Sequence, residues 1–262
     1  MPTELIQIDG LSIRYKSAGA GPPVLLLHGW GASMETFEPL FQALSHAFRA
    51  VVLDLPGHGQ SSLPPQPWHV SNYLDLVLKF MDATGLDQPH ILAHSFGGRI
   101  TIKLASAHPH RAGKLLLTAA AGIPPRQSLR TRVRKVLGAT AGKLQRTART
   151  SLPASEPLIR NINARLLPKL ASRDYLQAGP LRETLINVVS EDLTSYLASI
   201  QSPTLLLWGD HDRETPLSSA ETMASLIPNS ELIVLPGAGH FPFLDQMNKF
   251  HMRALRFFRE AA

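Results

Sequence analysis

Six short apolar runs recur along the chain, and segments of helical length lie around most of them. The runs are Val24–His28, Ala50–Leu55, His90–His94, Lys114–Thr118, Thr204–Trp208 and Glu231–Leu235. Nearly continuous apolar character over about five residues is typical of strands that are buried on both faces of a parallel sheet. Helices are predicted at Met34–Ser45, Asn72–Thr84, Gly97–Ala107, Leu217–Leu226 and Asp245–Arg259. The alternation predicts an α/β domain with a mostly parallel, doubly wound sheet.

The alternation is interrupted once, near the middle of the chain. Residues 122–198 contain no strand-like run, and their apolar residues follow helical spacing instead. Strand-like character returns at Thr204. We therefore expect a core formed by residues 1–121 and 199–262, with residues 122–198 inserted between two core strands as a helical cap. A hairpin with Asp-Gly as its turn is predicted at residues 5–15.

Positive charge is concentrated in the predicted cap. The whole chain has 26 Lys and Arg against 20 Asp and Glu, a net charge of +6. Residues 122–198 hold 13 basic and 5 acidic residues, a net +8, so the rest of the chain has a net charge of −2. Such a segment is either a solvated surface or a surface that attracts an anionic substrate or an acidic partner, such as an acyl carrier.

The composition and the missing motifs exclude several classes of protein. The chain has no Cys, which rules out disulfides, Cys-containing metal sites and a Cys nucleophile. Its first residues lack a signal-peptide pattern, and no apolar stretch approaches the roughly 20 residues that span a bilayer. No metal-binding or dinucleotide-binding motif is present. We expect a cytoplasmic protein that needs no metal or cofactor, binds no nucleic acid and has no membrane span.

The first motif with chemical content is Ala93-His94-Ser95-Phe96-Gly97-Gly98, which follows a predicted strand and opens a predicted helix. A serine on such a tight strand-to-helix turn presents its hydroxyl above the edge of the sheet, where it can act as a nucleophile. The turn requires small neighbours, and Gly97 provides one. The usual pattern is Gly-x-Ser-x-Gly, so Ala93 is a departure of one methyl group. His94 is expected to be structural.

The second motif is His28-Gly29-Trp30-Gly31, directly after an earlier predicted strand. Backbone N–H groups of Trp30 and Phe96 are the expected donors to an oxyanion above Ser95. A plain strand-to-helix turn is the alternative interpretation. His28, Gly29, Gly31 and Phe241 are expected to lie around the substrate pocket, with His28 also shaping the loop. The aromatic residues beside these motifs, Trp30, Phe96, Phe241 and Phe243, either pack in the core or form an apolar wall.

Two further motifs follow the last two predicted strands. One contains Asp210 and Asp212, and the other is Gly239-His240. All of these motifs come at carboxyl ends of strands, where open α/β sheets gather their ligands. The order of a serine, an acid and a histidine along the chain matches the order known for one class of serine hydrolases. Asp210 competes with Asp212 for the role of the acid, and Asp245 is expected at a helix start.

In this combination the motifs resemble those of the α/β-hydrolase superfamily, over nearly the whole chain. The similarity is greatest to its capped esterases and carbon–carbon-bond hydrolases, and the run Asp54–Ser61 resembles a structural turn of that group. The resemblance implies Ser95 as the nucleophile, His240 as the base and Asp212, rather than Asp210, as the acid. It also implies that the inserted segment is the cap.

The function that these expectations favour is hydrolysis of carboxylic esters with small or medium acyl groups. The same residues would also suit a carbon–carbon-bond hydrolase that acts on dienoates from aromatic ring cleavage, whose carboxylates would match the cap arginines. A receptor of the same fold that only binds a small molecule is an alternative of a different class. Haloperoxidase activity without a cofactor stays open. Haloalkane dehalogenation is disfavoured, because that branch has Asp in place of Ser95.

Overall fold

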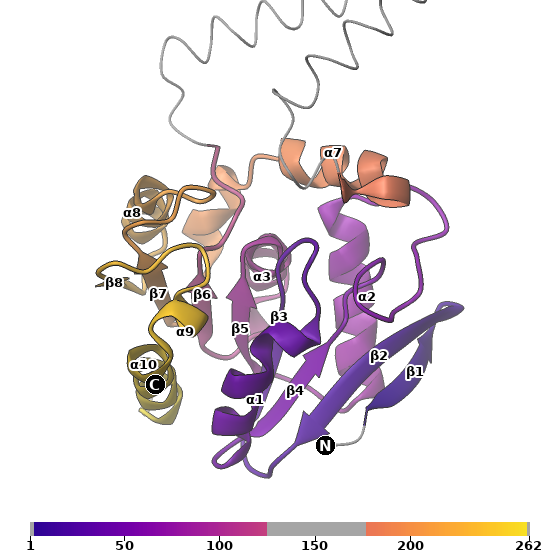
Figure 1. Ribbon diagram of the computed structural model, residues 1–262, viewed down its shortest axis with the longest axis horizontal. Coiled ribbons are helices and arrows are strands. Elements are labelled where there is room, and N and C mark those ends of the chain that lie inside the picture. Colours follow the sequence, from indigo (N-terminus) through magenta and orange to yellow (C-terminus); the bar gives the residue numbers. More distant parts are fainter. Residues whose placement is uncertain (1–2, 125–176, 261–262) are drawn as a thin grey trace, which may run out of the picture. The chain divides into compact units, whose positions relative to one another are not determined.

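In the computed structural model, which describes residues 3–124 and 177–260, eight strands form one sheet in the order β1-β2-β4-β3-β5-β6-β7-β8 (Figure 1). The strands are β1 (Glu4–Ile8), β2 (Leu11–Ala18), β3 (Pro23–Leu27), β4 (Arg49–Leu53), β5 (His90–His94), β6 (Leu115–Thr118), β7 (Thr204–Gly209) and β8 (Ser230–Leu235). β2 pairs antiparallel with β1 and β4, and all the remaining pairs are parallel. The predicted mostly parallel sheet is therefore confirmed.

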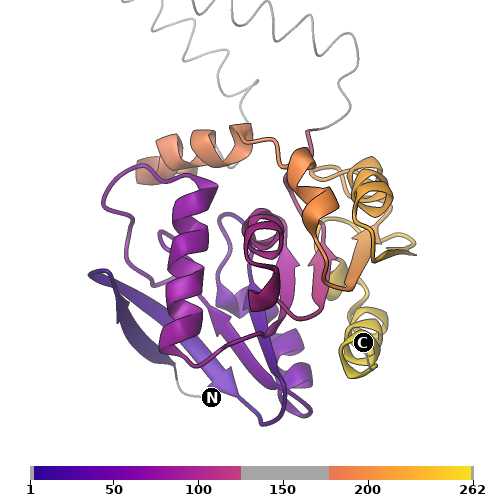
Figure 2. The ribbon, with the colours of Figure 1, turned by 180° about the vertical axis from the view of Figure 1, so that it is seen from behind.

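Helices cover both faces of this sheet. The helices of the described residues are η1 (Met34–Phe37), α1 (Glu38–Ser45), α2 (Val70–Ala83), α3 (Phe96–Ala107), η2 (Pro109–Arg111), η4 (Gly179–Leu181), α7 (Arg182–Ser190), η5 (Thr194–Ser199), α8 (Leu217–Leu226), α9 (Pro242–Asp245) and α10 (Met247–Arg259). Buried residues of α2, α3 and α8 belong to one hydrophobic cluster, and those of α1 and α10 belong to another. Figure 2 shows the molecule from behind, and α2 and α3 lie in front of the sheet in that view. The arrangement is the predicted doubly wound fold.

The two clusters explain why the strands are apolar throughout. Along β3, Val24 and Leu26 belong to the cluster of α1 and α10, whereas Leu25 and Leu27 belong to the cluster of α2, α3 and α8. All four side chains are fully buried. Because successive side chains of a strand point to opposite faces, a strand covered on both faces needs an apolar residue at every position.

The N-terminal hairpin also forms as the sequence predicts. Ile8 pairs with Leu11, so Asp9 and Gly10 form a two-residue turn. Both have positive φ, 50° and 78°, as a turn of type I′ requires. The hairpin extends the sheet on its antiparallel edge.

Two predicted helices are divided in the structure. The segment Met34–Ser45 consists of the 3₁₀ helix η1 followed by α1, with Pro39 at the start of α1. Asp245, which was expected to start the C-terminal helix, is instead the last residue of the short helix α9. Gln246 separates α9 from α10, because its φ of −131° and ψ of 52° are not helical.

Between β6 and β7 the described residues contain η4, α7 and η5 and no strand. Residues 125–176, which make up most of the predicted cap, lie outside the described part of the chain. The chain divides into one compact unit of Met1–Pro125 with Glu183–Ala262 and a second unit of Arg126–Arg182. The site described below lies entirely in the first unit.

The strand order determines where a site can form. From β3 the chain proceeds to β4 on one side and then returns to β5 on the other side of β3. At such a reversal the loops after the two strands diverge and leave a crevice at the carboxyl edge of the sheet. The loops after β3 and β5 are those that carry the first two motifs.

Candidate active site

Ser95 lies in the turn between β5 and α3 with a strained backbone. Its φ is 48° and its ψ is −108°, a combination that L-residues rarely adopt. Backbone hydrogen bonds hold it there. Its N–H donates to Thr118 O at 3.2 Å, and its carbonyl accepts from the N–H groups of Gly98 and Ala121, both at 3.0 Å. The sequence prediction of a tight turn at this serine is confirmed.

Small residues around Ser95 allow this turn to form. A Cβ atom at Gly97 would lie 2.2 Å from Leu27 O, and one at Gly98 would lie 2.4 Å from Ala120 Cβ. Either distance is too short for non-bonded atoms, so only glycine fits at these positions. Ala93, where the usual pattern has glycine, is fully buried in the core cluster, which therefore accommodates its methyl group.

The loop after β3 lies against the serine turn. His28 O accepts a hydrogen bond from Gly97 N at 3.1 Å. The ring of His28 is fully buried, with Nδ1 2.8 Å from Gly29 O and Nε2 accepting from Leu55 N at 3.0 Å. Burial lowers the pKa of His28 to about 4, so the ring is neutral. His28 shapes this loop, as the sequence predicted.

The two residues whose backbone N–H groups are the predicted oxyanion donors are in contact through their side chains. The rings of Trp30 and Phe96 meet edge to face, with centroids 5.4 Å apart. Neither backbone N–H takes part in the loop hydrogen bonds of the described residues. A Cβ atom at Gly29 would lie 3.3 Å from Ser95 Cβ, so this loop lies close to the serine side chain, whereas Gly31 is exposed.

Asp212 and His240 form a close pair. His240 Nδ1 lies 2.9 Å from Asp212 Oδ2 and 3.1 Å from Oδ1. The N–H groups of Glu214 and Thr215 donate to Oδ1 at 2.9 and 3.0 Å, and the Thr215 hydroxyl donates to Oδ2 at 2.7 Å. Burial alone would raise the pKa of Asp212, but the hydrogen bonds from His240 and Thr215 outweigh it and hold the pKa below its ordinary value.

The competing carboxylates have other partners. Asp210 Oδ1 accepts from Gly237 N at 2.7 Å, which ties the loop after β7 to the loop after β8. Asp245 Oδ2 accepts from Gly239 N at 2.7 Å. Of these carboxylates, the structure brings only Asp212 to the ring of His240.

The other ring nitrogen of His240 faces Glu214. Nε2 lies 3.4 Å from Glu214 Oε2, and the Glu214 side chain is 66% exposed. The hydroxyl of Ser95 forms no hydrogen bond with any described residue, so the structure does not place it against Nε2. Serine–histidine hydrogen bonds are often long in enzymes without bound substrate and tighten when it binds. An exposed Glu214 can move aside without disrupting the core.

His94 joins the serine turn to the histidine loop. Its Nε2 donates to the backbone carbonyl of His240 at 2.8 Å, and its ring packs against those of His240, Phe241 and Phe243. Burial lowers the pKa of His94 to about 3, so the ring is neutral. The structural role predicted for His94 is confirmed, although its partner was not foreseen.

The run Asp54–Ser61 forms a structural turn. The buried carboxylate of Asp54 accepts from Met34 N at 2.8 Å and from Gln60 N at 2.9 Å. The ring of His58 packs edge to face on Trp30, and burial lowers its pKa to about 3. This turn therefore packs against Trp30 and bonds to Met34 N, so it contacts the segment that follows β3.

Sequence reasoning missed Thr215 and Glu214. The spacing Asp-x-x-Thr-Pro held a usable signal for Thr215, because Asp side chains commonly accept from backbone N–H groups two or three residues further on. No sequence signal points to the contact of Glu214 with Nε2.

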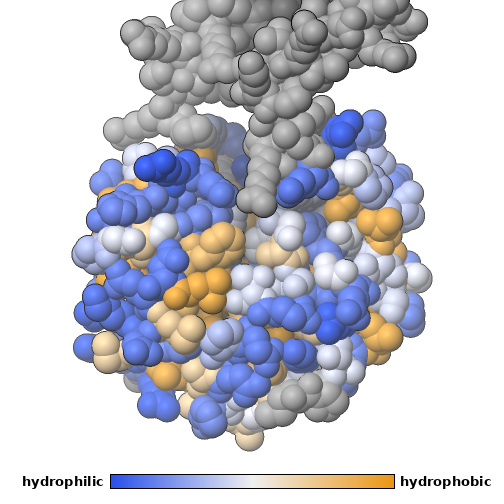
Figure 3. All heavy atoms as spheres, viewed as in Figure 1, coloured by the Kyte–Doolittle hydropathy of each residue, from blue (hydrophilic) through white to orange (hydrophobic). Residues whose placement is uncertain are grey.

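Phe241, expected at the pocket, packs on His94 and His240 and is 36% exposed. Hydrophobic side chains reach the surface on the face that carries α9 (Figure 3).

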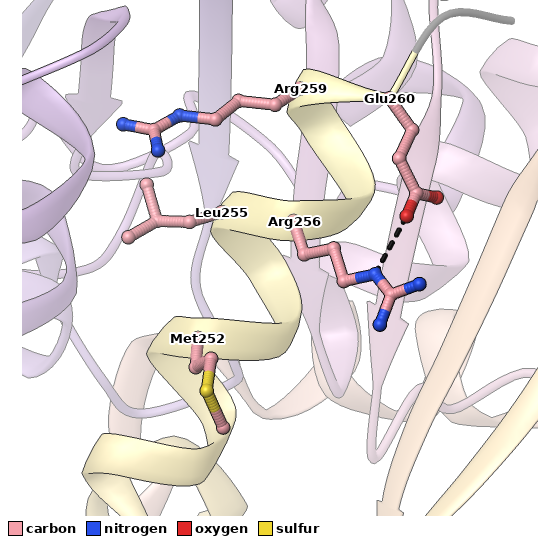
Figure 4. Close-up of a pocket in the computed structure, with 5 residues that line it drawn as sticks. All are labelled: Met252, Leu255, Arg256, Arg259 and Glu260. Atoms are coloured by element: carbon pink, nitrogen blue, oxygen red, sulfur yellow. Dashed lines mark hydrogen bonds and ion pairs between the residues drawn. The ribbon is translucent and has the colours of Figure 1, made fainter.

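A hollow of about 620 Å³ lies elsewhere, on α10 (Figure 4). It is lined by Met252, Leu255, Arg256, Arg259 and Glu260. Lys114, directly before β6, donates to Glu260 O, so this end of α10 lies at the amino edge of the sheet, opposite Ser95.

In residues 3–124 and 177–260 no three potential metal ligands lie together. None of the helices there has the length and apolar character of a membrane span.

Known proteins similar to this chain include hydrolases of one fold family. The sequence profile of the alpha/beta hydrolase fold family matches residues 22–246. A pimeloyl-[acyl-carrier protein] methyl ester esterase from Neisseria meningitidis is 31% identical over 87% of this chain and 90% of its own length. A 2-hydroxy-6-oxononadienedioate/2-hydroxy-6-oxononatrienedioate hydrolase from Dechloromonas aromatica is 29% identical over 94% of this chain and 90% of its own. The crystal structure of a hydrolase from Pseudomonas aeruginosa superposes with a TM-score of 0.74, at 27% identity and 98% coverage of both chains.

Proposed function

The chain belongs to the alpha/beta hydrolase fold family, and we propose that it is a serine hydrolase that cleaves carboxylic esters of small to medium acyl chains. Ser95 is the nucleophile, His240 the base and Asp212 the acid that orients the base. The observation that carries the proposal is the pairing of His240 with Asp212 at 2.9 Å, at the same sheet edge as the strained turn of Ser95. The three residues follow three different strands, β5, β7 and β8, whose carboxyl ends lie at one edge of the sheet.

In the proposed reaction, Oγ of Ser95 attacks the acyl carbonyl while Nε2 of His240 takes its proton. Asp212 holds the Nδ1–H tautomer and stabilises the imidazolium that forms. The backbone N–H groups of Trp30 and Phe96 face the oxyanion, and each such donor typically lowers the barrier by roughly 3 kcal/mol. His240 returns its proton to the leaving alcohol, and water activated by His240 then hydrolyses the acyl-enzyme.

Carbon–carbon-bond hydrolysis is the second candidate, favoured by the similarity to the Dechloromonas hydrolase. The same nucleophile, base and oxyanion donors serve both reactions, so the described residues do not favour one over the other. The identity with both relatives is near 30%, at which substrates commonly differ within one fold. A receptor that binds a small molecule without turnover is the alternative of a different class.

A hydrolysis screen separates these candidates. We expect the purified chain to hydrolyse p-nitrophenyl esters of graded acyl length, and a Ser95→Ala variant to show no turnover. A ring-cleavage dienoate is measured alongside, with its colour loss as the readout. Faster turnover of the dienoate than of every ester would favour the second candidate. Binding of either compound without turnover would favour the receptor.

We further propose that the basic segment attracts anionic substrates or an acidic acyl carrier. Its net charge of +8 at residues 122–198 supports this, and so does the similarity to an esterase of acyl-carrier substrates. Electrostatic attraction predicts that kcat/KM for an anionic ester falls as salt rises, because screening limits the field to about 8 Å near physiological ionic strength. A neutral ester of equal size is the control. An unchanged ratio after Arg130, Arg132 and Arg134 are replaced by Gln would contradict the idea.

A further inference from the structure

We infer that Thr215 is a positioning residue, which keeps Asp212 ionised and aimed at His240. The inference rests on the proposed function, because its meaning depends on the roles proposed for Asp212 and His240. Thr215 does not touch the reacting atoms, so it acts through the acid.

The backbone of Thr215 is fixed at two points. Its N–H donates to Asp212 Oδ1 at 3.0 Å. Its carbonyl accepts from the indole N–H of Trp208 at 2.8 Å, and Trp208 is a fully buried residue of β7. The position of the Thr215 hydroxyl is therefore set by the sheet itself rather than by a free loop.

The hydroxyl has one proton and three neighbouring polar atoms. These are Asp212 Oδ2 at 2.7 Å, Ala119 O at 3.0 Å and His240 Nδ1 at 3.4 Å. Nδ1 of His240 carries the hydrogen that faces Asp212, so it does not compete for the hydroxyl proton. Between the other two acceptors, the ionised carboxylate forms the stronger and shorter bond. Thr215 therefore donates to Asp212, and Ala119 O lies beside the same hydroxyl.

This bond affects both the charge and the direction of the carboxylate. Oδ2 accepts from the Thr215 hydroxyl and from His240, while Oδ1 accepts from two backbone N–H groups. With donors on both oxygens, the carboxylate cannot rotate away from His240 without losing a hydrogen bond. Donors to the charged form also keep it ionised, and Thr215 is one of the groups that lower the pKa of Asp212.

The test compares Thr215→Val, which removes the hydroxyl at nearly constant volume, with Thr215→Ser, which retains it. We expect Thr215→Val to lower kcat by about ten- to a hundredfold, as for loss of a hydrogen bond to a charged group, with KM little changed. Thr215→Ser should retain most of the activity. Thr194→Val is the matched control, because Thr194 also donates its hydroxyl to a nearby carboxylate, that of Asp192, at 2.6 Å. It should leave kcat unchanged.

A double-mutant cycle separates positioning from a general structural role. If Thr215 acts through the charge of Asp212, then Thr215→Val should change the rate by less than about twofold in an Asp212→Asn background. A merely structural residue would lower the rate by the same factor in both backgrounds. Equal factors in the two backgrounds, or a kcat of Thr215→Val equal to that of the wild type, would overturn the inference.

A fluorophosphonate probe that labels activated serines provides the readout independent of substrate. If wild-type Ser95 is not labelled, the proposed function fails and the role of Thr215 fails with it. If wild-type Ser95 is labelled, and Thr215→Val and Thr215→Ser are labelled equally fast, only the positioning role fails. Slow labelling of Thr215→Val with fast labelling of Thr215→Ser supports the inference, because only the variant without the hydroxyl then loses the activation of Ser95.

Discussion

The ring of His94 and the backbone of His240 are joined by a hydrogen bond of 2.8 Å, although 146 residues separate them in the sequence. His94 directly precedes Ser95, so this bond connects the serine turn to the backbone of His240. Among the described residues, no other side chain bonds to the backbone of His240. This bond therefore links the turn that carries Ser95 to the loop that carries His240.

Replacing His94 by Phe tests this coupling. The phenyl ring keeps the aromatic packing with Phe241 and Phe243 but cannot donate to His240 O. We expect kcat on an ester substrate to fall by about tenfold, the effect of one lost hydrogen bond at a positioned base. His90→Phe is the control, because it makes the same change at the other end of β5. A kcat of His94→Phe no lower than that of His90→Phe would contradict the role.

The identity of the acid is tested by two Asn substitutions. Asp212→Asn should lower kcat by a factor on the order of 10⁴, because an amide cannot stabilise the imidazolium and favours the wrong tautomer. Asp210→Asn should have a small effect, since the Asn oxygen can still accept from Gly237 N. Steady-state kinetics of both variants decide the assignment. The reverse ranking would identify Asp210 as the acid.

Acid conditions should unfold the protein through its buried histidines. Burial lowers the pKa of His28 to about 4 and those of His58 and His94 to about 3, whereas the unfolded chain has the ordinary value near 6.5. Below pH 6.5 the unfolded state thus binds more protons than the folded state, and stability falls as pH falls. The loss continues until the folded pKa values are reached, between about pH 4 and pH 3.

Urea unfolding at two pH values measures this effect. Each histidine should contribute about 2 kcal/mol of lost stability between pH 7.5 and pH 5, provided that its folded pKa lies well below 5. His58→Phe should reduce the pH dependence by about that amount, because it removes one of the three rings. Equal free energies of unfolding at the two pH values would show that these rings are not held neutral.

The sequence predicted the strands more closely than the site. Burial on both faces requires continuous apolar residues, and β5 and β8 were predicted to within one residue of their bounds. The turn at Ser95 was predictable too, because a small residue such as Gly97 is needed where the turn lies close to an adjoining strand. The pairing of Asp212 with His240 could be expected from motif order, but the choice against Asp210 depended on resemblance.

The contacts that sequence could not predict all depend on loop conformation. The carbonyl of His240 is a backbone group, so nothing in the sequence marks it as the partner of His94. The hydroxyl of Thr215 bonds to Asp212, and the indole N–H of Trp208 holds the Thr215 carbonyl, a contact between a strand residue and a loop. Such contacts follow no period along the chain, and therefore no pattern of apolar residues predicts them.

The serine turn offers a last test, in which two glycines differ in what surrounds them. A methyl group at Gly97 would lie 2.2 Å from Leu27 O, whereas at Gly31 it would meet nothing within 4 Å. Gly31 has a φ of 67°, so Gly31→Ala should cost about 1 kcal/mol of backbone strain. Gly97→Ala should cost about 2–3 kcal/mol or more, because α3 must move away from β3 and carry Ser95 with it. Urea unfolding compares the two variants, and the labelling rate of Ser95 by a fluorophosphonate reports its displacement. If Gly97→Ala is as stable as Gly31→Ala and is labelled as fast as the wild type, then close contact between α3 and β3 does not shape the turn.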